Sequence, residues 1–336
     1  MHSPLHLSLL LPLLSLAIPS LAAVRTTPPA NCITVAKSGG QFSTLQSAVN
    51  SLSTSSSGTQ CIFIYPGTYN EQVLIPARKA LLTIYGSTSD TTSYKSNTVL
   101  ITQKKSQLDG GISNDETATL RVKSEGFKLY NVNVENSYGK GSQAVAVSAY
   151  AESGYYGVRL WGYQDTLLAN KGRQVYAKSE IVGVTDFIFG QESPAWFEGV
   201  DVRVKESGSG YVTASGRSSA SSANYYVFNR CTVAAASGNN VANGAYYLGR
   251  PWREYARVVF QNSNLSSVIN SAGWRIWNSG DERTSNVYFG EYANSGAGAS
   301  GTRASFATKM SKAVAIDAVL GSGYASAAFY DASYMK

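Results

Sequence analysis

The sequence is poor in histidine, and this scarcity limits the chemistry that the chain can perform. Of its 336 residues only His2 and His6 are histidines, and both lie in an N-terminal segment that we expect to be removed. The mature chain would then contain no histidine. A Ser-His-Asp triad, a Cys-His pair and a histidine-ligated zinc site are thereby excluded. Proton transfer near neutral pH must rely on carboxylates, lysine or tyrosine.

Long apolar runs are also absent, except for one at the N-terminus. Leu5–Ala23 holds about 15 apolar residues interrupted by two prolines, which is too few to span a bilayer. The small residues Ser20 and Ala22 fit a signal-peptidase site. We therefore predict a signal peptide at residues 1–22 rather than a membrane anchor. The remainder, residues 23–336, is expected to be one secreted, extracellular domain with no membrane association.

Cysteine is scarce, with three residues in the chain. In a secreted protein, Cys32 and Cys61 could form a disulfide that closes a loop of about 29 residues and stabilises the fold by about 3–4 kcal/mol. The alternative, that all three cysteines are free core residues, stays open. Cys231 lies in an apolar run and is predicted to be a buried, unreactive thiol. Three cysteines do not indicate a metal site.

Negative charge is in deficit, because 28 Lys and Arg face 21 Asp and Glu, giving a net charge of +7. A basic secreted protein is attracted to polyanions such as acidic polysaccharides, nucleic acids and anionic membranes. The basic residues are scattered rather than clustered, which argues against a nucleic-acid partner. The charge agrees with an acidic polysaccharide without selecting one.

What the chain does contain is a series of short Val-, Ile-, Thr- and Tyr-rich runs separated by Gly, Asn and Ser, which is typical of β-strands. Four segments share an aromatic residue, polar residues and then alternating apolar positions; they begin at Tyr130, Phe197, Phe228 and Phe260. Apolar residues at helical spacing occur near the ends, over residues 42–52 and, more weakly, over residues 306–316. The first of these stripes could cover an open end of a sheet.

A sharper repeat places Leu160-Trp-Gly-Tyr-Gln-Asp165 and Ile181-Val-Gly-Val-Thr-Asp186 in one register, 21 residues apart. Self-similarity at a fixed period in a strand-rich chain indicates a solenoid. The predicted fold is therefore an all-β, right-handed parallel β-helix with short helices near its ends. A β-sandwich is the alternative, but it does not require this period.

The period also stacks polar side chains on one face of the solenoid. The series begins at Gln143 and continues 21 and 22 residues later with the adjacent Gln164 and Asp165. Asp186 follows Asp165 after a further 21 residues. Residues one coil apart in a β-helix are separated by about 4.8 Å. Two carboxylates this close do not both ionise readily, so one can act as a nucleophile while the other holds a proton. Arg250, held extended by the proline that follows it, could keep one carboxylate ionised.

Several segments resemble, in order and spacing, the signature segments of the pectin methylesterase family. The four segments that carry this resemblance are Gln143-Ala-Val-Ala, Gly162-Tyr-Gln-Asp-Thr-Leu, Gly183-Val-Thr-Asp-Phe-Ile-Phe-Gly and Leu248-Gly-Arg-Pro-Trp. The segments that begin at Gly40 and Tyr65 resemble the N-terminal part of that family's sequences. The resemblance runs from about Val35 to Trp277. The chain resembles the microbial members of the family, because we do not expect it to carry the inhibitor-like pro-region of many plant members.

The resemblance implies hydrolysis of methyl esters of galacturonic acid in pectin, with release of methanol. Asp186 would attack the ester carbonyl and form an acyl-enzyme, and Arg250 would keep Asp186 ionised. Gln143 and Gln164 would donate hydrogen bonds to the oxyanion, and Asp165 would act as general acid and then as general base. The implied partner is methyl-esterified homogalacturonan, bound by a monomer. No cofactor and no metal are implied.

The resemblance also implies an aromatic sugar-binding cleft made by Phe189, Trp252 and Trp274. Plant members carry tyrosine where this chain has Leu168, so one expected contact is missing. The sequon Asn264-Leu-Ser is a candidate N-glycosylation site.

Other interpretations remain open at this stage. The stacked polar residues could be structural, as polar ladders in β-helices often are, and an Asp186–Arg250 pair could be a structural ion pair. The tryptophans predicted to line the cleft could instead be core residues, because buried tryptophan is common. A glycosidase on the same fold would also use two carboxylates about 5 Å apart, although the glutamine pair serves an acyl oxyanion better. A calcium-dependent lyase would need a dense acidic cluster. A non-catalytic polysaccharide-binding solenoid would release neither methanol nor new reducing ends.

Overall fold

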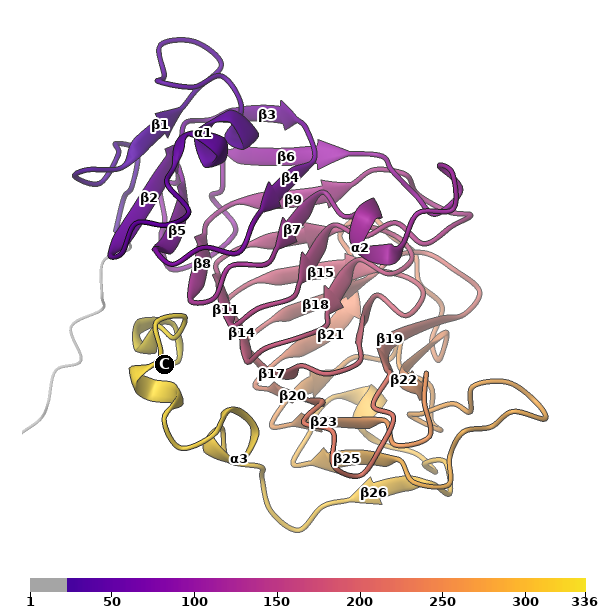
Figure 1. Cartoon of the computed structure of the whole chain (residues 1–336). Helices are drawn as coiled ribbons and strands as arrows, with labels where there is room; N and C mark the ends of the chain where they lie inside the picture. Colours follow the sequence, from indigo (N-terminus) through magenta and orange to yellow (C-terminus); the bar gives the residue numbers. More distant parts are fainter. Residues whose placement is uncertain (1–22) are drawn as a thin grey trace, which may run out of the picture.

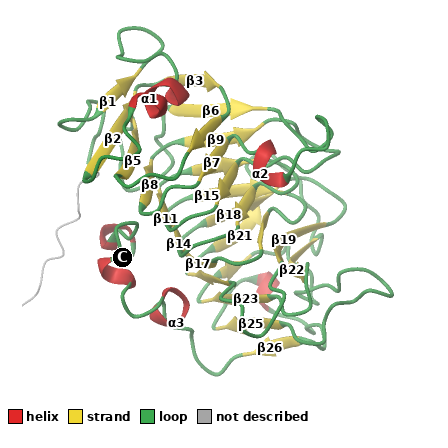
Figure 2. Cartoon of the chain, viewed as in Figure 1, coloured by secondary structure: helices red, strands yellow, loops and turns green. Residues whose placement is uncertain are grey.

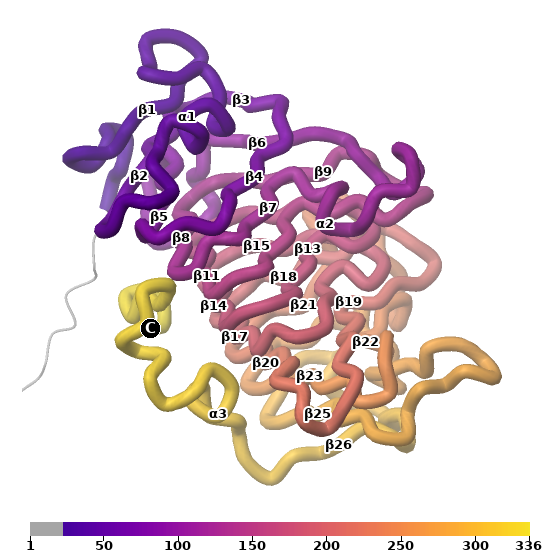
Figure 3. The backbone as a smooth tube through the Cα atoms, viewed as in Figure 1, coloured from indigo at the N-terminus to yellow at the C-terminus, as the bar shows by residue number. Residues whose placement is uncertain are grey.

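The computed structural model describes residues 23–336, and the predicted signal peptide at residues 1–22 lies outside this part. The chain winds through three parallel β-sheets in a repeating order, so that a typical turn adds one strand to each sheet (Figure 1). The tube view shows the successive turns stacked along one axis (Figure 3). This architecture is the right-handed parallel β-helix that the sequence predicts.

The strands of the eleven-stranded sheet are β1 (Ile33–Val35), β2 (Thr59–Ile64), β5 (Leu81–Gly86), β8 (Phe127–Tyr130), β11 (Ser153–Tyr156), β14 (Gln174–Ala177), β17 (Pro194–Glu198), β20 (Tyr225–Asn229), β23 (Arg257–Gln261), β25 (Tyr288–Tyr292) and β26 (Ala307–Lys309). Those of the eight-stranded sheet are β3 (Gly67–Asn70), β6 (Val99–Gln103), β9 (Asn133–Asn136), β12 (Arg159–Trp161), β15 (Glu180–Gly183), β18 (Asp201–Val204), β21 (Thr232–Ala235) and β24 (Asn264–Leu265). Those of the seven-stranded sheet are β4 (Val73–Ile75), β7 (Leu120–Val122), β10 (Val147–Ala149), β13 (Leu167–Ala169), β16 (Ile188–Gly190), β19 (Gly210–Ser215) and β22 (Tyr246–Pro251).

The 21-residue repeat is confirmed as one coil of the solenoid, because Leu160 pairs with Ile181 in the eight-stranded sheet. Of the four aromatic segments, those at Phe197, Phe228 and Phe260 are in one register. The segment at Tyr130 is displaced by one position, so that Tyr130 aligns with Tyr156 instead. The cause is the left-handed corner of each coil, which has positive φ at Asn131, Gly157, Lys178, Gly199, Arg230 and Asn262. Tyr130 directly precedes its corner, whereas each phenylalanine precedes its corner by two residues.

The interior of the solenoid holds a ladder of stacked aromatic rings along the eleven-stranded sheet. Tyr155, Tyr176, Phe197, Phe228 and Phe260 follow one another with ring centroids 4.2–4.9 Å apart. All five side chains are fully buried. Since each ring comes from the same position of successive coils, the ladder stabilises the register that also aligns the polar residues.

Helices are few and lie outside the sheets (Figure 2). They are α1 (Leu45–Ser51), α2 (Asn114–Thr117), α3 (Asp317–Leu320) and the 3₁₀ turns η1 (Ala297–Ala299), η2 (Tyr324–Ser326) and η3 (Ala332–Tyr334). The Thr44 side chain caps α1, and the buried face of this helix packs on β1 and β4. Those strands are the first of their sheets, so the predicted cover of an open end is confirmed.

The prediction of a helix over residues 306–316 is wrong. Ala307–Lys309 forms β26, which pairs with β25, and helix α3 begins later, at Asp317. The apolar residues of the stripe do not share one face, because Phe306 packs against the interior core whereas Met310 and Val314 pack on the outer side of the sheet. Pairing with β25 satisfies the backbone here and overrides the weak helical spacing.

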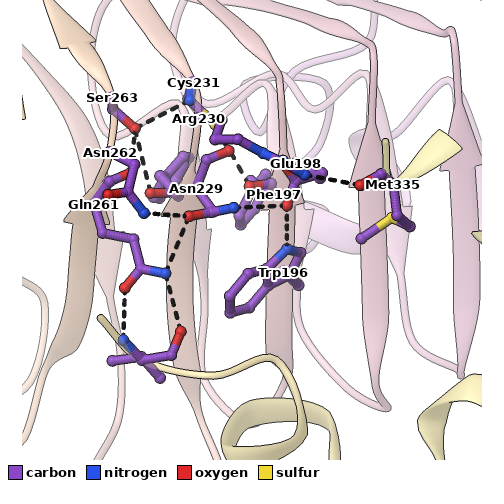
Figure 4. A network of polar contacts seen from close by, with 12 residues as sticks. Trp196, Phe197, Glu198, Asn229, Arg230, Cys231, Gln261, Asn262, Ser263 and Met335 are labelled. Carbon is purple, nitrogen blue, oxygen red and sulfur yellow. Dashed lines mark hydrogen bonds and ion pairs between the residues drawn. The ribbon is translucent and has the colours of Figure 1, made fainter. Parts of the chain in front are cut away.

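The C-terminal segment runs back along the outer side of the eleven-stranded sheet (Figure 1) and is joined to it by a polar ladder (Figure 4). Gln261 bonds the backbone of Val314 through both its oxygen and its nitrogen. Gln261 also donates to Asn229, and Asn229 donates to Glu198 at 2.9 Å. Arg230 links Glu198 to the carbonyl of Met335. The ladder therefore connects three coils with the end of the chain.

The cysteine alternatives are settled by the structure. Cys32 and Cys61 form a disulfide, and Cys231 is a free, buried thiol. Burial raises the pKa of the Cys231 thiol, so it is kept in its unreactive form. Across residues 23–336 we find no helix of sufficient length and hydrophobicity to cross a membrane.

Candidate active site

A pocket of about 240 Å³ opens on the side of the seven-stranded sheet and brings the predicted catalytic residues together. Its polar wall consists of Gln143, Gln164, Asp165, Asp186 and Arg250. Successive coils supply these side chains, because the two glutamines and the two aspartates come just before β10, β13 and β16, and Arg250 lies in β22. The predicted convergence of two carboxyls, two amides and one guanidinium is therefore confirmed.

Asp165 and Asp186 occupy equivalent corners of adjacent coils. The backbone of Gln164 forms an isolated parallel β-bridge with Thr185 in the next coil, and the backbone N–H of Asp165 donates to the Thr185 carbonyl at 3.1 Å. Both aspartates have left-handed backbones, with φ of 65° and 51°. Aspartate tolerates this conformation better than most residues, and such strained positions concentrate at functional sites. The corner directs both carboxyls out of the sheet and into the pocket.

Arg250 holds Asp186 with two parallel hydrogen bonds. Its Nε donates to Oδ1 at 2.9 Å and its Nη2 donates to Oδ2 at 2.7 Å. The guanidinium also packs on aromatic rings, 4.1 Å from the Tyr211 ring centre and 4.2 Å from the Trp277 ring centre. Two-point pairing together with ring contacts fixes the guanidinium plane and hence the orientation of the Asp186 carboxylate.

The two aspartates differ in how strongly they retain a proton. Burial raises the pKa of Asp165 well above its usual range, the charge of Asp186 raises this pKa further, and Arg250 lowers it. Burial also raises the pKa of Asp186, but here the hydrogen bonds and the charge of Arg250 act in the opposite direction. Within residues 23–336, no protein group donates a hydrogen bond to the Asp165 side chain. These contributions favour Asp165 over Asp186 as the site of a single proton shared by the pair.

The side-chain amides of Gln143 and Gln164 face the pocket and are half-buried. Their backbone carbonyls are engaged, since that of Gln143 accepts from Gln107 and that of Gln164 accepts from Ala144. Neither side-chain amide is used in a hydrogen bond with another residue of the described chain. Each amide can thus donate an N–H to an oxygen that is placed next to the aspartates.

The aromatic part of the pocket only partly matches the prediction. Phe189 and Trp252 line it, with ring centroids 6.0 Å apart. Leu168, where plant relatives have tyrosine, is 3% exposed and packs against Phe189 in a small apolar cluster below the pocket. It therefore supports the pocket floor and provides no polar contact.

The prediction that Trp274 lines the cleft is wrong. Trp274 is 1% exposed and stacks on Phe289 with ring centroids 4.3 Å apart. Its indole N–H donates to Glu291, so its polar atom is satisfied inside the protein. Trp274 continues the interior aromatic ladder and has no surface available to a sugar.

Sequence reasoning missed three residues of the site: Asn114, Tyr211 and Trp277. Trp277 and Asn114 line the pocket, and Tyr211 packs on Arg250. In the sequence, Trp277 follows Trp274 by three residues, and nothing there distinguishes which of the two tryptophans lines the pocket. Asn114 comes from the short helix α2, far from the motifs in the sequence.

Two further sequence predictions concern metals and glycans. The residues that the structure describes contain no group of three or more His, Cys, Asp or Glu side chains arranged to hold a metal ion. Asn264 is exposed in β24, the edge strand of its sheet, so its side chain is accessible. Glycosylation of Asn264 stays a prediction.

Comparison with known proteins places this chain in a family. A family model described as pectinesterase matches residues 32–322. A pectinesterase from Aspergillus aculeatus is 52% identical over 321 residues, covering 95% of this chain and 96% of that protein. A pectinesterase from Aspergillus niger is 50% identical over 323 residues, covering 95% and 97%.

Solved structures agree with the sequence relatives. A crystal structure of the pectin methylesterase from Aspergillus niger in deglycosylated form has a TM-score of 0.86 and 42% identity, covering 93% of this chain and 100% of that one. Pectin methylesterase from carrot has a TM-score of 0.81 and 27% identity, with the same coverage. The chain therefore belongs to the pectinesterase family of carboxylic ester hydrolases.

Proposed function

We propose that this protein hydrolyses the methyl esters of galacturonic acid in pectin through an acyl-enzyme formed on Asp186. Family membership supports ester hydrolysis over cleavage of the glycosidic bond or binding alone. One observation carries the residue assignment. Asp186 is paired at two points with Arg250, whereas Asp165, in the same pocket, has no side-chain partner among residues 23–336 and retains its proton more strongly.

In the first half of the reaction, an Asp186 oxygen attacks the ester carbonyl carbon. The negative charge that develops on the carbonyl oxygen is stabilised by N–H bonds from Gln143 and Gln164. The bond to the methoxy oxygen then breaks, and Asp165 transfers its proton to that oxygen as methanol leaves. The product is an anhydride between Asp186 and the galacturonate carboxyl, and Asp165 is left ionised.

In the second half, water attacks the galacturonate carbonyl of the anhydride. Asp165 takes a proton from this water, and the same two amides again stabilise the oxyanion. The bond to the Asp186 oxygen breaks, and Asp186 returns to a carboxylate paired with Arg250. One ester and one water thus give one methanol and one free acid, and both aspartates recover their starting states.

The partner and the location follow from the same reasoning. Methyl-esterified homogalacturonan is the proposed substrate, and Phe189, Trp252 and Trp277 provide apolar surface for its sugar rings. The net charge of +7 favours association with a polyanion. The Cys32–Cys61 disulfide supports an oxidising, extracellular location. We propose that the protein is secreted after loss of residues 1–22 and acts as a monomer.

The test is to assay methanol release and viscosity together on methylated pectin. The proposal predicts methanol release while the chain length, and hence the early viscosity, is maintained. New reducing ends and a rapid fall in viscosity would instead indicate a glycosidase. Binding to pectin with neither product would indicate a non-catalytic module.

A further inference from the structure

A narrow loop over residues 275–283 carries Trp277, one wall of the pocket. The loop is held at its base by the Trp277 backbone N–H, which donates to the Glu282 carbonyl at 3.1 Å. Its tip is closed by reciprocal bonds between Asn278 and Asp281, at 3.1 and 3.2 Å. The tip residues, 278–281, are exposed. The Trp277 ring packs on the apolar cluster that contains Phe189 and on Arg250, and a group that ties the loop to the solenoid would hold it there.

Arg283, at the end of this loop, makes the contacts that could do so. Its Nη1 donates to the Trp252 carbonyl at 2.6 Å. Its Nε and Nη2 donate to the Asp281 carboxylate at 3.0 and 2.6 Å. Its guanidinium carbon lies 4.8 Å from the centre of the Trp277 ring. One planar group thus joins the end of β22, the loop tip and the indole ring.

The backbone of Arg283 is itself strained, since its φ is 56°. A non-glycine residue with a left-handed backbone persists only where surrounding contacts fix it, and such residues cluster at functional sites. The three contacts of the guanidinium supply that constraint.

We infer that Arg283 is a positioning residue that holds Trp252 and Trp277 at the spacing required for the sugar chain. This inference rests on the proposed function, because it assigns the two tryptophans to substrate binding. Preformed aromatic surfaces bind more tightly because the rings lose less conformational freedom when the ligand arrives. Trp277 also lies 4.2 Å from Arg250, so its placement bears on the guanidinium that holds Asp186.

A lysine cannot replace Arg283 in this role. Lysine presents a single ammonium group, which can reach the Trp252 carbonyl or the Asp281 carboxylate but lacks the planar fork that holds both. It also covers less of an indole ring. The conservative variant Arg283→Lys is therefore expected to resemble Arg283→Ala more than the parent.

The simpler explanation is a surface ion pair that contributes little. The Arg283 and Asp281 side chains are 25% and 51% exposed, and exposed pairs contribute little to stability. The chain offers a matched control in Arg203, which pairs with Asp201 at the same two-residue spacing and is 21% exposed. Arg203 lies in β18, on another sheet, and does not line the pocket.

The experiment compares Arg283→Ala, Arg283→Lys and Arg203→Ala. The KM and kcat for methanol release from a methyl-esterified oligogalacturonide are measured for each, together with Tm. In an Asp186→Asn background, which keeps the pocket but blocks turnover, tryptophan fluorescence gives Kd for the same oligomer. We expect both Arg283 variants to raise KM and Kd by about tenfold, with kcat within about threefold. Arg203→Ala should leave all of these parameters within twofold.

The inference is overturned if Arg283→Ala binds and turns over the oligomer within twofold of the parent. It is also overturned if Arg203→Ala weakens binding equally, or if Arg283→Lys restores parental affinity. A loss of kcat with Kd unchanged would mean that Arg283 supports the catalytic step and not substrate binding, and this result would also contradict the inference. Failure of the proposed function is distinguishable, because the parent protein would then release no methanol.

Discussion

Two stacks of polar side chains run across adjacent coils of this solenoid, and they differ in whether their hydrogen bonds are satisfied. On the outer side of the eleven-stranded sheet, Glu198 accepts from Trp196, Asn229 and Arg230 (Figure 4). In the pocket of the seven-stranded sheet, Asp186 is likewise paired with an arginine. Its neighbour Asp165 receives no hydrogen bond from any side chain of the described residues and faces open space.

The comparison shows why a buried carboxylate next to an arginine is not by itself a catalytic site. The Glu198 stack is saturated, so it joins coils and anchors the C-terminal segment. Among the described residues, the Asp165–Asp186 stack leaves one carboxyl and two amides without protein partners, so these groups are free to bind a ligand. Unsatisfied polar groups that converge on a pocket are the feature that identifies the site.

The largest contrast should come from Asp186→Asn. Amide nitrogen and oxygen cannot replace the attacking carboxylate, so we expect methanol release to fall by at least about 10³-fold. The side chain has nearly the same shape, so the circular dichroism spectrum and Tm should change little. Turnover near the parental rate would show that this stack is structural, like that of Glu198.

The next largest effect is expected for Gln164→Ala. Removing one oxyanion donor in comparable sites lowers kcat by about 10²–10³-fold. The loss should appear in kcat more than in KM, because the N–H bond strengthens as charge develops. Steady-state kinetics with a methylated oligomer would measure this. An equal change in KM with kcat preserved would assign Gln164 to ground-state binding.

Arg250→Lys should lower kcat by about 10²-fold and move the pH profile. The hydrogen bonds of Arg250 lower the pKa of Asp186, so their loss raises that pKa. Since Asp186 must be ionised to attack, activity would be lost at a higher pH as the solution is acidified. The acidic limb of the kcat/KM profile measures this shift. A parental rate with an unmoved limb would contradict the assignment.

The smallest effect on activity should come from Glu198→Gln, although its effect on stability should be clear. A glutamine offers one acceptor oxygen instead of two and turns an N–H₂ group toward donors, which costs about 1–3 kcal/mol. For a chain of this size, Tm should fall by several degrees while kcat and KM stay at parental values. A loss of activity without a loss of Tm would mean that the two stacks are coupled.

Much of this arrangement could be predicted from the sequence, because backbone pairing in a solenoid converts sequence spacing into distance. The 21-residue step between Asp165 and Asp186 is such a case, and it placed both carboxyls in one pocket. The one-residue displacement of Tyr130 could not be predicted from its aromatic character. The corner residue sets the register there, and its left-handed backbone leaves only a weak trace in the sequence.

The tryptophans show a second limit. Trp274 and Trp277 are three residues apart in an irregular segment, where neither the period of a strand nor that of a helix indicates which side chain points inward. Trp274 continues the interior ladder, and Trp277 faces the pocket. Contacts made by irregular segments and short helices, such as those of Arg283 and of Asn114 in α2, depend on tertiary folding and carry no local pattern.

The central claim is that Asp165 holds the proton of the pair while Asp186 is ionised. It can be tested by following the side-chain carboxyl carbons in ¹³C-labelled protein across a pH titration, with Asp165→Asn and Asp186→Asn used for assignment. We expect the Asp165 carboxyl to titrate well above the usual range and above Asp186, and its pKa to fall in Asp186→Asn as the neighbouring charge is lost. Protonation of Asp186 at a pH where Asp165 is already ionised would contradict the account.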